Sequence, residues 1–288
     1  MTDNITLLND SYKDIDFESY LLHYEYYQKV YFIMHVVTCI IISIGLPLTL
    51  MTIYALFSLV RKDHVAPIYV INLLISDLIQ LCCMIILETE LYQTHAIVYN
   101  IYCCGLGISV GFMVCVSLER YLVIAHPLWY RFKRTIKISV VVSVVVWLIP
   151  PVFYLTVVPW VTLKIAGITS FIFLIIPFPL FIFSLVGTLR ALSASVSVPS
   201  EEKQRIVGTL VLVLLIYTLL FVPSMIWVLV RSDKFDITLI NLSNIFAKLS
   251  PLADLILYVF FSKKSIDKLF TAVNCCRVAN TDANISTV

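Results

Sequence analysis

Two groups of charged residues interrupt an otherwise apolar sequence. Glu119 and Arg120 stand side by side at the end of a long apolar run, and Asp77 and Asp254 each lie within another one. Charges in or beside a lipid bilayer are costly, so such residues usually mark a function. An arginine beside a glutamate can pair with it in one state and turn toward another partner in a second state. Two carboxylates near mid-membrane repel each other, so they must bind a proton or share a cation.

The elements that position these residues must be membrane-spanning helices. The chain has 288 residues, of which 60% are hydrophobic and 13% charged, and its mean hydropathy is +0.97. A soluble domain needs more polar residues to cover its surface. The apolar runs are continuous over about 20 residues, whereas a β-barrel would alternate polar and apolar positions. The net charge of +2 does not indicate a nucleic-acid partner.

We expect an all-α membrane protein, a seven-transmembrane helix bundle with a short amphipathic eighth helix. The predicted spans are residues 30–60, 66–88, 95–125, 136–158, 166–192, 204–231 and 237–261. The predicted organisation is an extracellular N-terminal segment at 1–29, a transmembrane domain at 30–261, and a cytoplasmic amphipathic helix and tail at 262–288. No cleavable signal peptide is expected, because the first residues are polar and acidic.

The distribution of basic residues predicts the orientation in the membrane. Lys and Arg collect on one side, for example at 131–134 and 263–268, and cytoplasmic loops carry this excess. The N-terminus is therefore expected outside the plasma membrane and the C-terminus inside. Asn4 and Asn9 begin N-glycosylation patterns that can be used only outside. Cys275 and Cys276 follow the amphipathic segment and are either palmitoylated or two unmodified thiols. The other cysteines fall within predicted spans, so no outer disulfide and no metal site are expected.

Several motifs, in order along these spans, resemble those of the rhodopsin-like (class A) G-protein-coupled receptors. They are GLPLTL at 45–50, NLLISD at 72–77, Glu119-Arg120-Tyr121, Trp147, YTLLFVP at 217–223 and DLILY at 254–258. The resemblance covers nearly the whole chain. Gly-Leu-Pro in span one, Phe-x-Pro in span six and Asp-x-x-x-Tyr in span seven look most like the branch of proton-sensing and nucleotide receptors.

The resemblance implies a receptor that transmits an extracellular stimulus to a heterotrimeric G protein. Its coupling and switch residues would be Glu119, Arg120, Tyr121, Tyr217, Phe221, Pro223 and Tyr258. Asp77, Ser109, Ser250 and Asp254 fall where the family has a buried sodium site, and a sodium ion at Asp77 is the one cofactor expected. Two acids in place of an Asp and an Asn favour proton coupling. The alternative is a neutral polar cluster that only packs helices.

Four residues are candidates for the ligand site: Lys248, His95, Glu88 and Glu90. Lys248 holds the position of the retinal-binding lysine of opsins, but the opsin counter-ion position in span three is Val98. A lysine in an apolar cavity also suits an anionic amphiphile, such as a fatty acid or lysophospholipid. An internal ion pair with Glu88 or Glu90 is the third alternative. Outer histidines and carboxylates could instead sense protons, because an imidazole titrates near pH 6.5.

Three departures from the family pattern bear on signalling. His95 replaces the usual cysteine of span three, Leu185 replaces a tyrosine of span five, and Leu255 replaces the proline that kinks span seven. They leave open a seven-transmembrane scaffold that does not signal. An enzyme is not expected, because no nucleophile–base pair is present. A transporter is not expected either, because the chain has 7 Gly, no repeat and an odd number of spans.

Overall fold

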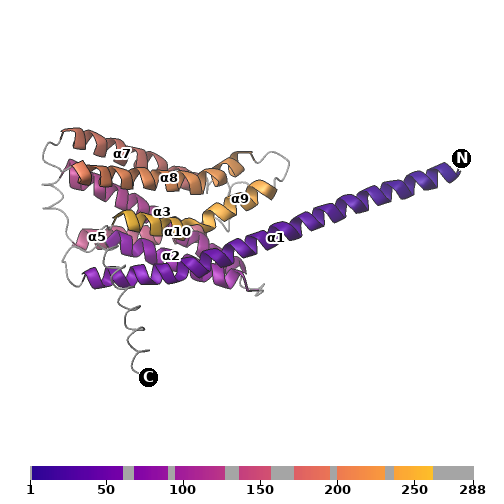
Figure 1. Ribbon diagram of the computed structural model, residues 1–288, viewed down its shortest axis with the longest axis horizontal. Coiled ribbons are helices and arrows are strands. Elements are labelled where there is room, and N and C mark those ends of the chain that lie inside the picture. The colour runs from indigo at the N-terminus through magenta and orange to yellow at the C-terminus, as the bar shows by residue number, and fades with distance from the viewer. Residues whose placement is uncertain are drawn as a thin grey trace, which may run out of the picture. The chain divides into compact units, whose positions relative to one another are not determined.

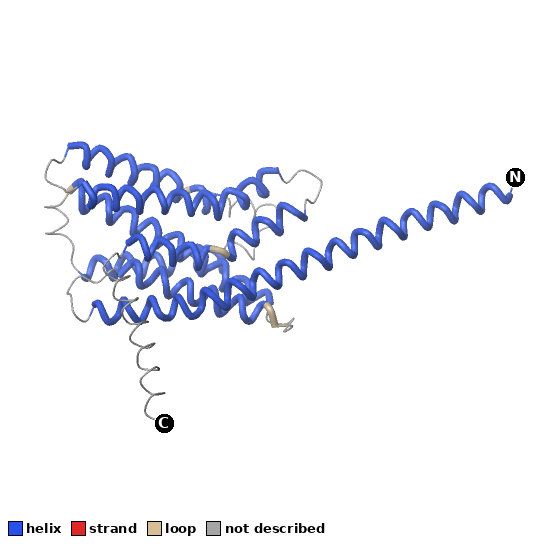
Figure 2. Tube along the Cα trace, in the orientation of Figure 1, coloured by secondary structure: helices blue, strands red, loops and turns tan. Residues whose placement is uncertain are grey.

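A computed structural model of the chain describes residues 2–60, 68–89, 95–126, 136–156, 172–194, 200–230 and 237–261 (Figures 1 and 2). Every secondary-structure element within these ranges is a helix, as the all-α prediction requires. The chain divides into two compact units, Met1–Ile40 and Ile41–Val288. The bundle that carries the candidate site belongs to the second unit. The predicted amphipathic eighth helix lies outside the described residues.

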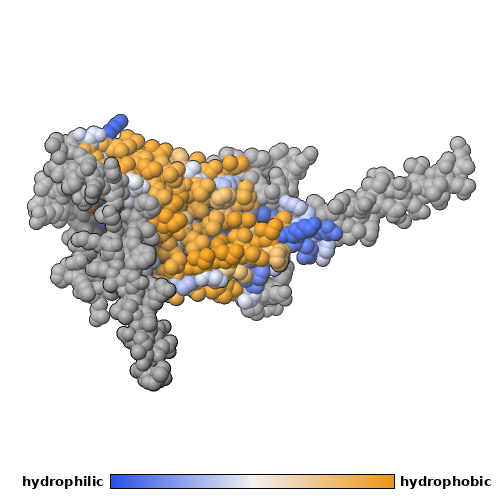
Figure 3. Space-filling model, viewed as in Figure 1, coloured by the Kyte–Doolittle hydropathy of each residue, from blue (hydrophilic) through white to orange (hydrophobic). Residues whose placement is uncertain are grey.

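The helices follow the predicted spans closely. They are α1 (Thr2–Val60), α2 (Ile68–Leu87), α3 (His95–Ala125), α5 (Ile136–Thr156), α7 (Pro177–Ala194), α8 (Ser200–Val230), α9 (Ile237–Lys248) and α10 (Ser250–Phe261). Among the described residues, six helices are long and apolar enough to cross a membrane, and their apolar side chains cover much of the visible bundle surface (Figure 3). The seventh predicted span is formed by α9 and α10 together.

The first helix begins earlier than predicted. It starts at Thr2 rather than near residue 30, although its membrane-spanning part is Tyr24–Phe57. The polar residues of the N-terminal segment include neither proline nor glycine, so no residue of this stretch breaks the helix. Hydropathy predicts where a helix enters the membrane, and not where it begins.

The seventh span is interrupted at Leu249, between α9 and α10. Pro251 has no backbone N–H, so the regular bond to the Ala247 carbonyl is missing. At the start of α10, the Leu249 carbonyl accepts hydrogen bonds from the backbone N–H groups of Leu252 and Ala253, each at 3.1 Å. Helix α10 runs without a break through Leu255, as expected where the proline of the family is replaced. A different proline, Pro251, breaks the span nearer its start, and the chain changes direction there (Figure 1).

Helix α3 is the centre of the bundle and packs against α2, α5, α7 and α8, while α10 packs against α2 and α8. The core around it contains Phe112, Met113 and Tyr217. Trp147 of α5 stacks edge-on against Phe112 at 6.2 Å and donates a 2.9 Å hydrogen bond to Asn72 Oδ1 of α2. These contacts hold α2, α3 and α5 in the register that places the polar residues of the core.

Candidate functional site

Two aspartates from different helices meet in the core, and we call them the acid pair. Asp77 of α2 and Asp254 of α10 are both 0% exposed. Each carboxyl group interacts with the other and with the hydroxyl of Ser109 on α3. The Ser109 hydroxyl donates a 2.8 Å hydrogen bond to Asp254 Oδ2. The structure thus brings together these three residues of the predicted ion or proton site.

Each carboxyl group of the acid pair has one oxygen with a donor and one without. Gln80 Nε2 donates to Asp77 Oδ1 at 3.2 Å, and Ser109 occupies Asp254 Oδ2. Asp77 Oδ2 and Asp254 Oδ1 are buried and have no hydrogen-bond donor. Like charges this close and this deeply buried cannot both remain ionised without a counter-charge. The acid pair therefore needs a bound proton or a cation to balance its charge.

The same residues suit a small hard cation. Sodium prefers oxygen ligands, and the acid pair offers two carboxylates close to the Ser109 hydroxyl. Ser250 lies one helical turn before Asp254 on α10, and its buried hydroxyl has no hydrogen-bond partner. These oxygen ligands therefore suit the sodium ion expected from the sequence as well as they suit a proton.

Gln80 is a member of this site that the sequence analysis missed. Its side chain is fully buried, and its Oε1 atom has no donor. It lies three residues after Asp77, so both side chains share one face of α2. A glutamine within an apolar run, one turn from an aspartate, was the signal available in the sequence.

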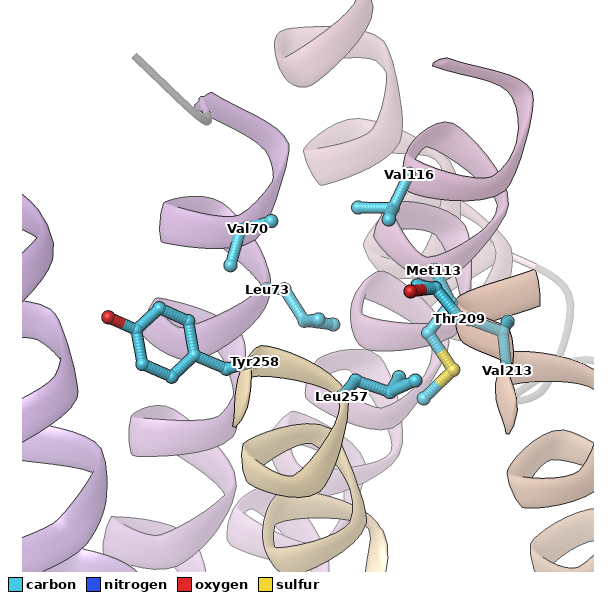
Figure 4. A pocket seen from close by; sticks show the side chains of 8 residues that line it. All are labelled: Val70, Leu73, Met113, Val116, Thr209, Val213, Leu257 and Tyr258. Carbon is cyan, nitrogen blue, oxygen red and sulfur yellow. The ribbon is translucent and has the colours of Figure 1, made fainter. Parts of the chain in front are cut away.

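Below the acid pair, toward the predicted cytoplasmic end, lies a small apolar cavity of about 10 Å³, just large enough for one water molecule. Its lining comes from α2, α3, α8 and α10 and consists of Val70, Leu73, Met113, Val116, Thr209, Val213, Leu257 and Tyr258 (Figure 4). Leu73, Met113 and Leu257 each lie about one helical turn beyond an acid-pair residue or Ser109. We call these three residues the apolar layer. They separate the acid pair from Arg120.

The Glu119-Arg120-Tyr121 triplet lies near the end of α3, with Glu119 buried and Arg120 half-buried. The Tyr121 ring packs edge-on against Phe183 of α7 at 5.2 Å. Close packing continues at Gly187, where an added Cβ would lie 2.5 Å from Tyr121 Cε2. Tyr121 therefore joins α3 to α7 at a position where any larger residue than glycine would force the tyrosine ring to shift.

The aromatic residues of α8 form a second contact between helices. The rings of Tyr217 and Phe221 lie 4.9 Å apart, and Phe181 of α7 is equally close to Tyr217. The Tyr217 hydroxyl donates a hydrogen bond to the Leu174 carbonyl, just before the turn at Ile176 that precedes α7. Pro223 lies inside α8, less than one turn beyond Phe221.

Tyr258 lines the small apolar cavity. Its side chain is 3% exposed, and its buried hydroxyl has no hydrogen-bond partner. In Figure 4 this hydroxyl points away from the other labelled side chains. The structure thus places this predicted switch residue beside the cavity and apart from the acid pair.

Lys248 and Glu88 form an ion pair at the predicted outer end of the bundle, where α2 ends and α3 begins. Lys248 Nζ lies 3.4 Å from Glu88 Oε1, and both side chains are 19% exposed. His95 is nearby in sequence and donates to the Thr89 carbonyl at 3.1 Å. Of the three alternatives for Lys248, the structure thus contains the internal pair with Glu88. This arrangement resembles a lysine with its counter-ion and leaves the pair within reach of a ligand.

Several predicted sites cannot be placed. Glu90, Cys275 and Cys276 lie outside the described residues, and the structure describes no side chain at Asn4 or Asn9. The six cysteines within the described ranges are all free.

Comparisons with known proteins agree with this architecture. The family model described as "7 transmembrane receptor (rhodopsin family)" matches residues 49–165. G-protein coupled receptor 68 from Bos taurus is 26% identical over 266 residues, covering 79% of this chain and 74% of that protein. The Homo sapiens protein of the same name is 26% identical, covering 79% and 73%. Proteinase-activated receptor 2 from Rattus norvegicus is 25% identical, covering 83% and 71%.

These matches bear on three predictions. The predicted resemblance to the rhodopsin-like receptors is confirmed by the family model and by the receptor relatives. The relatives are receptors by name, which agrees with the expectation of a receptor rather than an enzyme. With the apolar helices, they also identify a multi-pass plasma-membrane protein.

Proposed function

Because the chain resembles the rhodopsin-like family of seven-transmembrane receptors, we propose that it transmits an extracellular proton signal to a heterotrimeric G protein. The observation that carries this proposal is the acid pair. Two carboxyl groups from α2 and α10 adjoin in the core, and each has a buried oxygen without a donor. A site built in this way responds to protons by changing its own charge.

The acid pair has two states that differ in how α2, α3 and α10 are held. With one proton shared, the carboxyl groups are hydrogen-bonded to each other and draw α2 and α10 together. Without that proton, their repulsion favours separation of the two helices or binding of a sodium ion, which balances the charge. The Ser109 hydroxyl on Asp254 Oδ2 passes the change to α3. The proton thereby acts as a ligand with different affinity for the two conformations.

The signal reaches the cytoplasmic face by packing. The apolar layer formed by Leu73, Met113 and Leu257 lies between the acid pair and Arg120. Movement of α10 and α3 repacks this layer and frees Arg120 for the G protein, while α8 turns about Pro223. Such a transition resembles other helix shifts in switching proteins, in which packed cores have discrete arrangements. Arg120 is the residue that we expect to contact the partner.

The orientation and modifications follow from the same proposal. The N-terminus is extracellular and the C-terminus cytoplasmic, as the basic residues indicate. Asn4 and Asn9 carry glycans, and Cys275 and Cys276 carry palmitoyl groups. The basic inner loops attract anionic membrane lipids and the acidic surface of the G protein.

A second stimulus is favoured by the Lys248–Glu88 pair. A cation within an apolar bundle, one fifth exposed, is a suitable partner for an anionic lipid-like ligand. A retinal Schiff base on Lys248 with Glu88 as counter-ion is the less favoured alternative. The opsin counter-ion position is Val98, and Phe221 stands where an opsin would have the tryptophan of span six.

The proposal is tested by G-protein activation in transfected cells, scanned from about pH 8 to about pH 6, the range in which protons act as physiological signals. The wild type is expected to respond to acidification, and Asp254→Asn to lose the response at equal surface expression. Glu25→Gln tests the alternative that outer carboxylates sense protons, because Glu25 is an exposed carboxylate of α1 that pairs with Lys29, and this variant should keep the response. Loss of the response in Arg120→Ala would place Arg120 in coupling. A flat wild-type profile would contradict proton sensing, and a chain that is silent under every stimulus would be a scaffold.

A further inference from the structure

Helix α9 is structurally separate from the rest of the seventh span. It ends at Lys248, and α10 begins at Ser250 after the break at Leu249. Because Pro251 cannot donate to the Ala247 carbonyl, the backbone ladder between the two helices is incomplete. Helix α9 packs extensively against α8. The break therefore allows α9 to move with α8 while α10 stays with the acid pair.

Two side-chain contacts hold α9 at the predicted outer end. The hydroxyls of Ser243 on α9 and Ser224 on α8 are 2.6 Å apart, which strengthens the attachment of α9 to α8. The Lys248–Glu88 pair joins α9 to α2 instead. Movement of α8 and α9 away from α2 must break this ion pair but can leave the serine contact intact.

The ion pair is open to exchange by another anion. Its N···O distance of 3.4 Å is longer than the roughly 2.7–2.9 Å of a strong charge-assisted hydrogen bond. Both side chains are partly exposed, so an incoming group can reach them without prior opening of the core. A lysine ammonium is a point charge with rotatable donors and accepts any oxyanion, whether carboxylate or phosphate.

The surroundings favour an anion with an apolar chain. Ile85 and Ile86 stand just before Glu88 on α2 and are 39% and 42% exposed. On a membrane-spanning helix these exposed side chains face lipid. Ile85 lies three residues before Glu88 and so shares its face of α2. A molecule in the outer leaflet can therefore bring an oxyanion to Lys248 while its chain contacts Ile85.

We propose that Lys248 is the headgroup site for an anionic amphiphile, whose carboxylate or phosphate replaces Glu88 and releases α9 from α2. The inference rests on the proposed receptor function only in that movement of α8 is what the G protein reads. Binding at Lys248 itself requires no G protein. The site also differs from the acid pair, so the two can be tested apart.

Direct binding of radiolabelled oleate to the purified full-length receptor, in nanodiscs of phosphatidylcholine, tests the site. Methyl oleate is the neutral control, lysophosphatidate tests a phosphate headgroup, and inorganic phosphate tests the charge without a chain. We expect saturable binding of oleate or lysophosphatidate, and none of methyl oleate. Lys248→Met should weaken binding by at least about tenfold, the effect of losing one charge-assisted contact.

Glu88→Gln separates a ligand site from a purely structural ion pair. This variant leaves Lys248 without its carboxylate, so oleate should bind more tightly than to the wild type and should raise the melting temperature by a larger amount. The double variant Glu88→Gln with Lys248→Met contains no unpaired charge and should fold, but bind no oleate. If the ion pair is only structural, oleate should not raise the melting temperature of either variant.

Each outcome decides the inference separately from the proton response. Unchanged binding in Lys248→Met, equal binding of methyl oleate, or no saturable binding of either amphiphile to the wild type would overturn the headgroup site. An acid response that persists in Lys248→Met and disappears in Asp254→Asn would leave the proposed function intact in all these cases. Loss of the acid response in the wild type, with oleate binding retained, would overturn proton sensing alone.

Discussion

The bundle contains two pairs of charged residues in opposite surroundings. Asp77 and Asp254 carry the same charge and are 0% exposed, whereas Lys248 and Glu88 carry opposite charges and are 19% exposed. The first pair cannot be satisfied by its own members and requires a proton or a cation. The second pair satisfies itself and can exchange one member for another anion. This difference is the basis on which we propose a different stimulus for each pair.

Neutralising each pair in turn gives the largest expected effect and the clearest comparison. The double variant Asp77→Asn with Asp254→Asn should lose all acid-evoked G-protein activation, because neither member of the acid pair can then bind or release a proton. The double variant Glu88→Gln with Lys248→Met should retain that activation. The measurement is activation against extracellular pH at matched surface expression. A retained response in the first variant, or a lost one in the second, would reverse the assignment.

The apolar layer between the acid pair and Arg120 is tested by one polar substitution. Leu257→Asn places an amide where the lining is apolar, and an unsatisfied buried amide costs about 1–3 kcal/mol. Thermal unfolding of the purified receptor should show this loss, with Leu257→Met as the volume-conserving control. Equal melting temperatures of the two variants would contradict this, because they would mean that water in the layer can hydrogen-bond to the amide.

The contact between α3 and α7 is tested at Gly187. An alanine there brings Cβ within 2.5 Å of Tyr121, so the tyrosine must shift and G-protein activation should fall by several-fold, equivalent to about 1 kcal/mol. Gly208→Ala is a matched control, since an added Cβ meets nothing within 4 Å. The proposed role of Tyr121 does not survive if both variants signal like the wild type.

The smallest effect is expected from one hydroxyl group. Tyr217→Phe removes the hydrogen bond to the Leu174 carbonyl and should shift basal activity by about fivefold, which corresponds to about 1 kcal/mol. Tyr102→Phe removes a buried hydroxyl that has no hydrogen-bond partner and should change basal activity little. Basal activation without acid distinguishes them, and equal effects would argue against a specific role for the Tyr217 bond.

The acid pair could be predicted from the sequence because charge inside an apolar run is a strong signal. A carboxylate in a membrane-spanning helix is costly and almost always faces the bundle interior, and length and hydropathy placed Asp77 and Asp254 in such helices. Ser109 required the family resemblance, since serines in apolar helices usually bond their own backbone, as Ser143 does with the Ser139 carbonyl. Partners of this kind depend on helix packing, which the local sequence does not contain.

Other features were available in the sequence but were given too little weight. Pro251 is a sequence signal for the break that precedes α10, whereas the expectation for Leu255 concerns a position four residues further along the helix. Gln80 indicated a further polar group beside Asp77. The bond from Tyr217 to Leu174 could not be predicted, because it joins two helices through a backbone carbonyl near a proline-rich turn.

The central claim is that the acid pair takes up a proton when the outside is acidified. Infrared difference spectroscopy of the purified receptor between about pH 8 and about pH 6 measures this directly through the carbonyl stretch of a protonated carboxyl group. The account predicts that the wild type gains this signal at low pH and that Asp254→Asn does not. A wild type without the signal, or an Asp254→Asn variant that keeps it unchanged, would contradict the account.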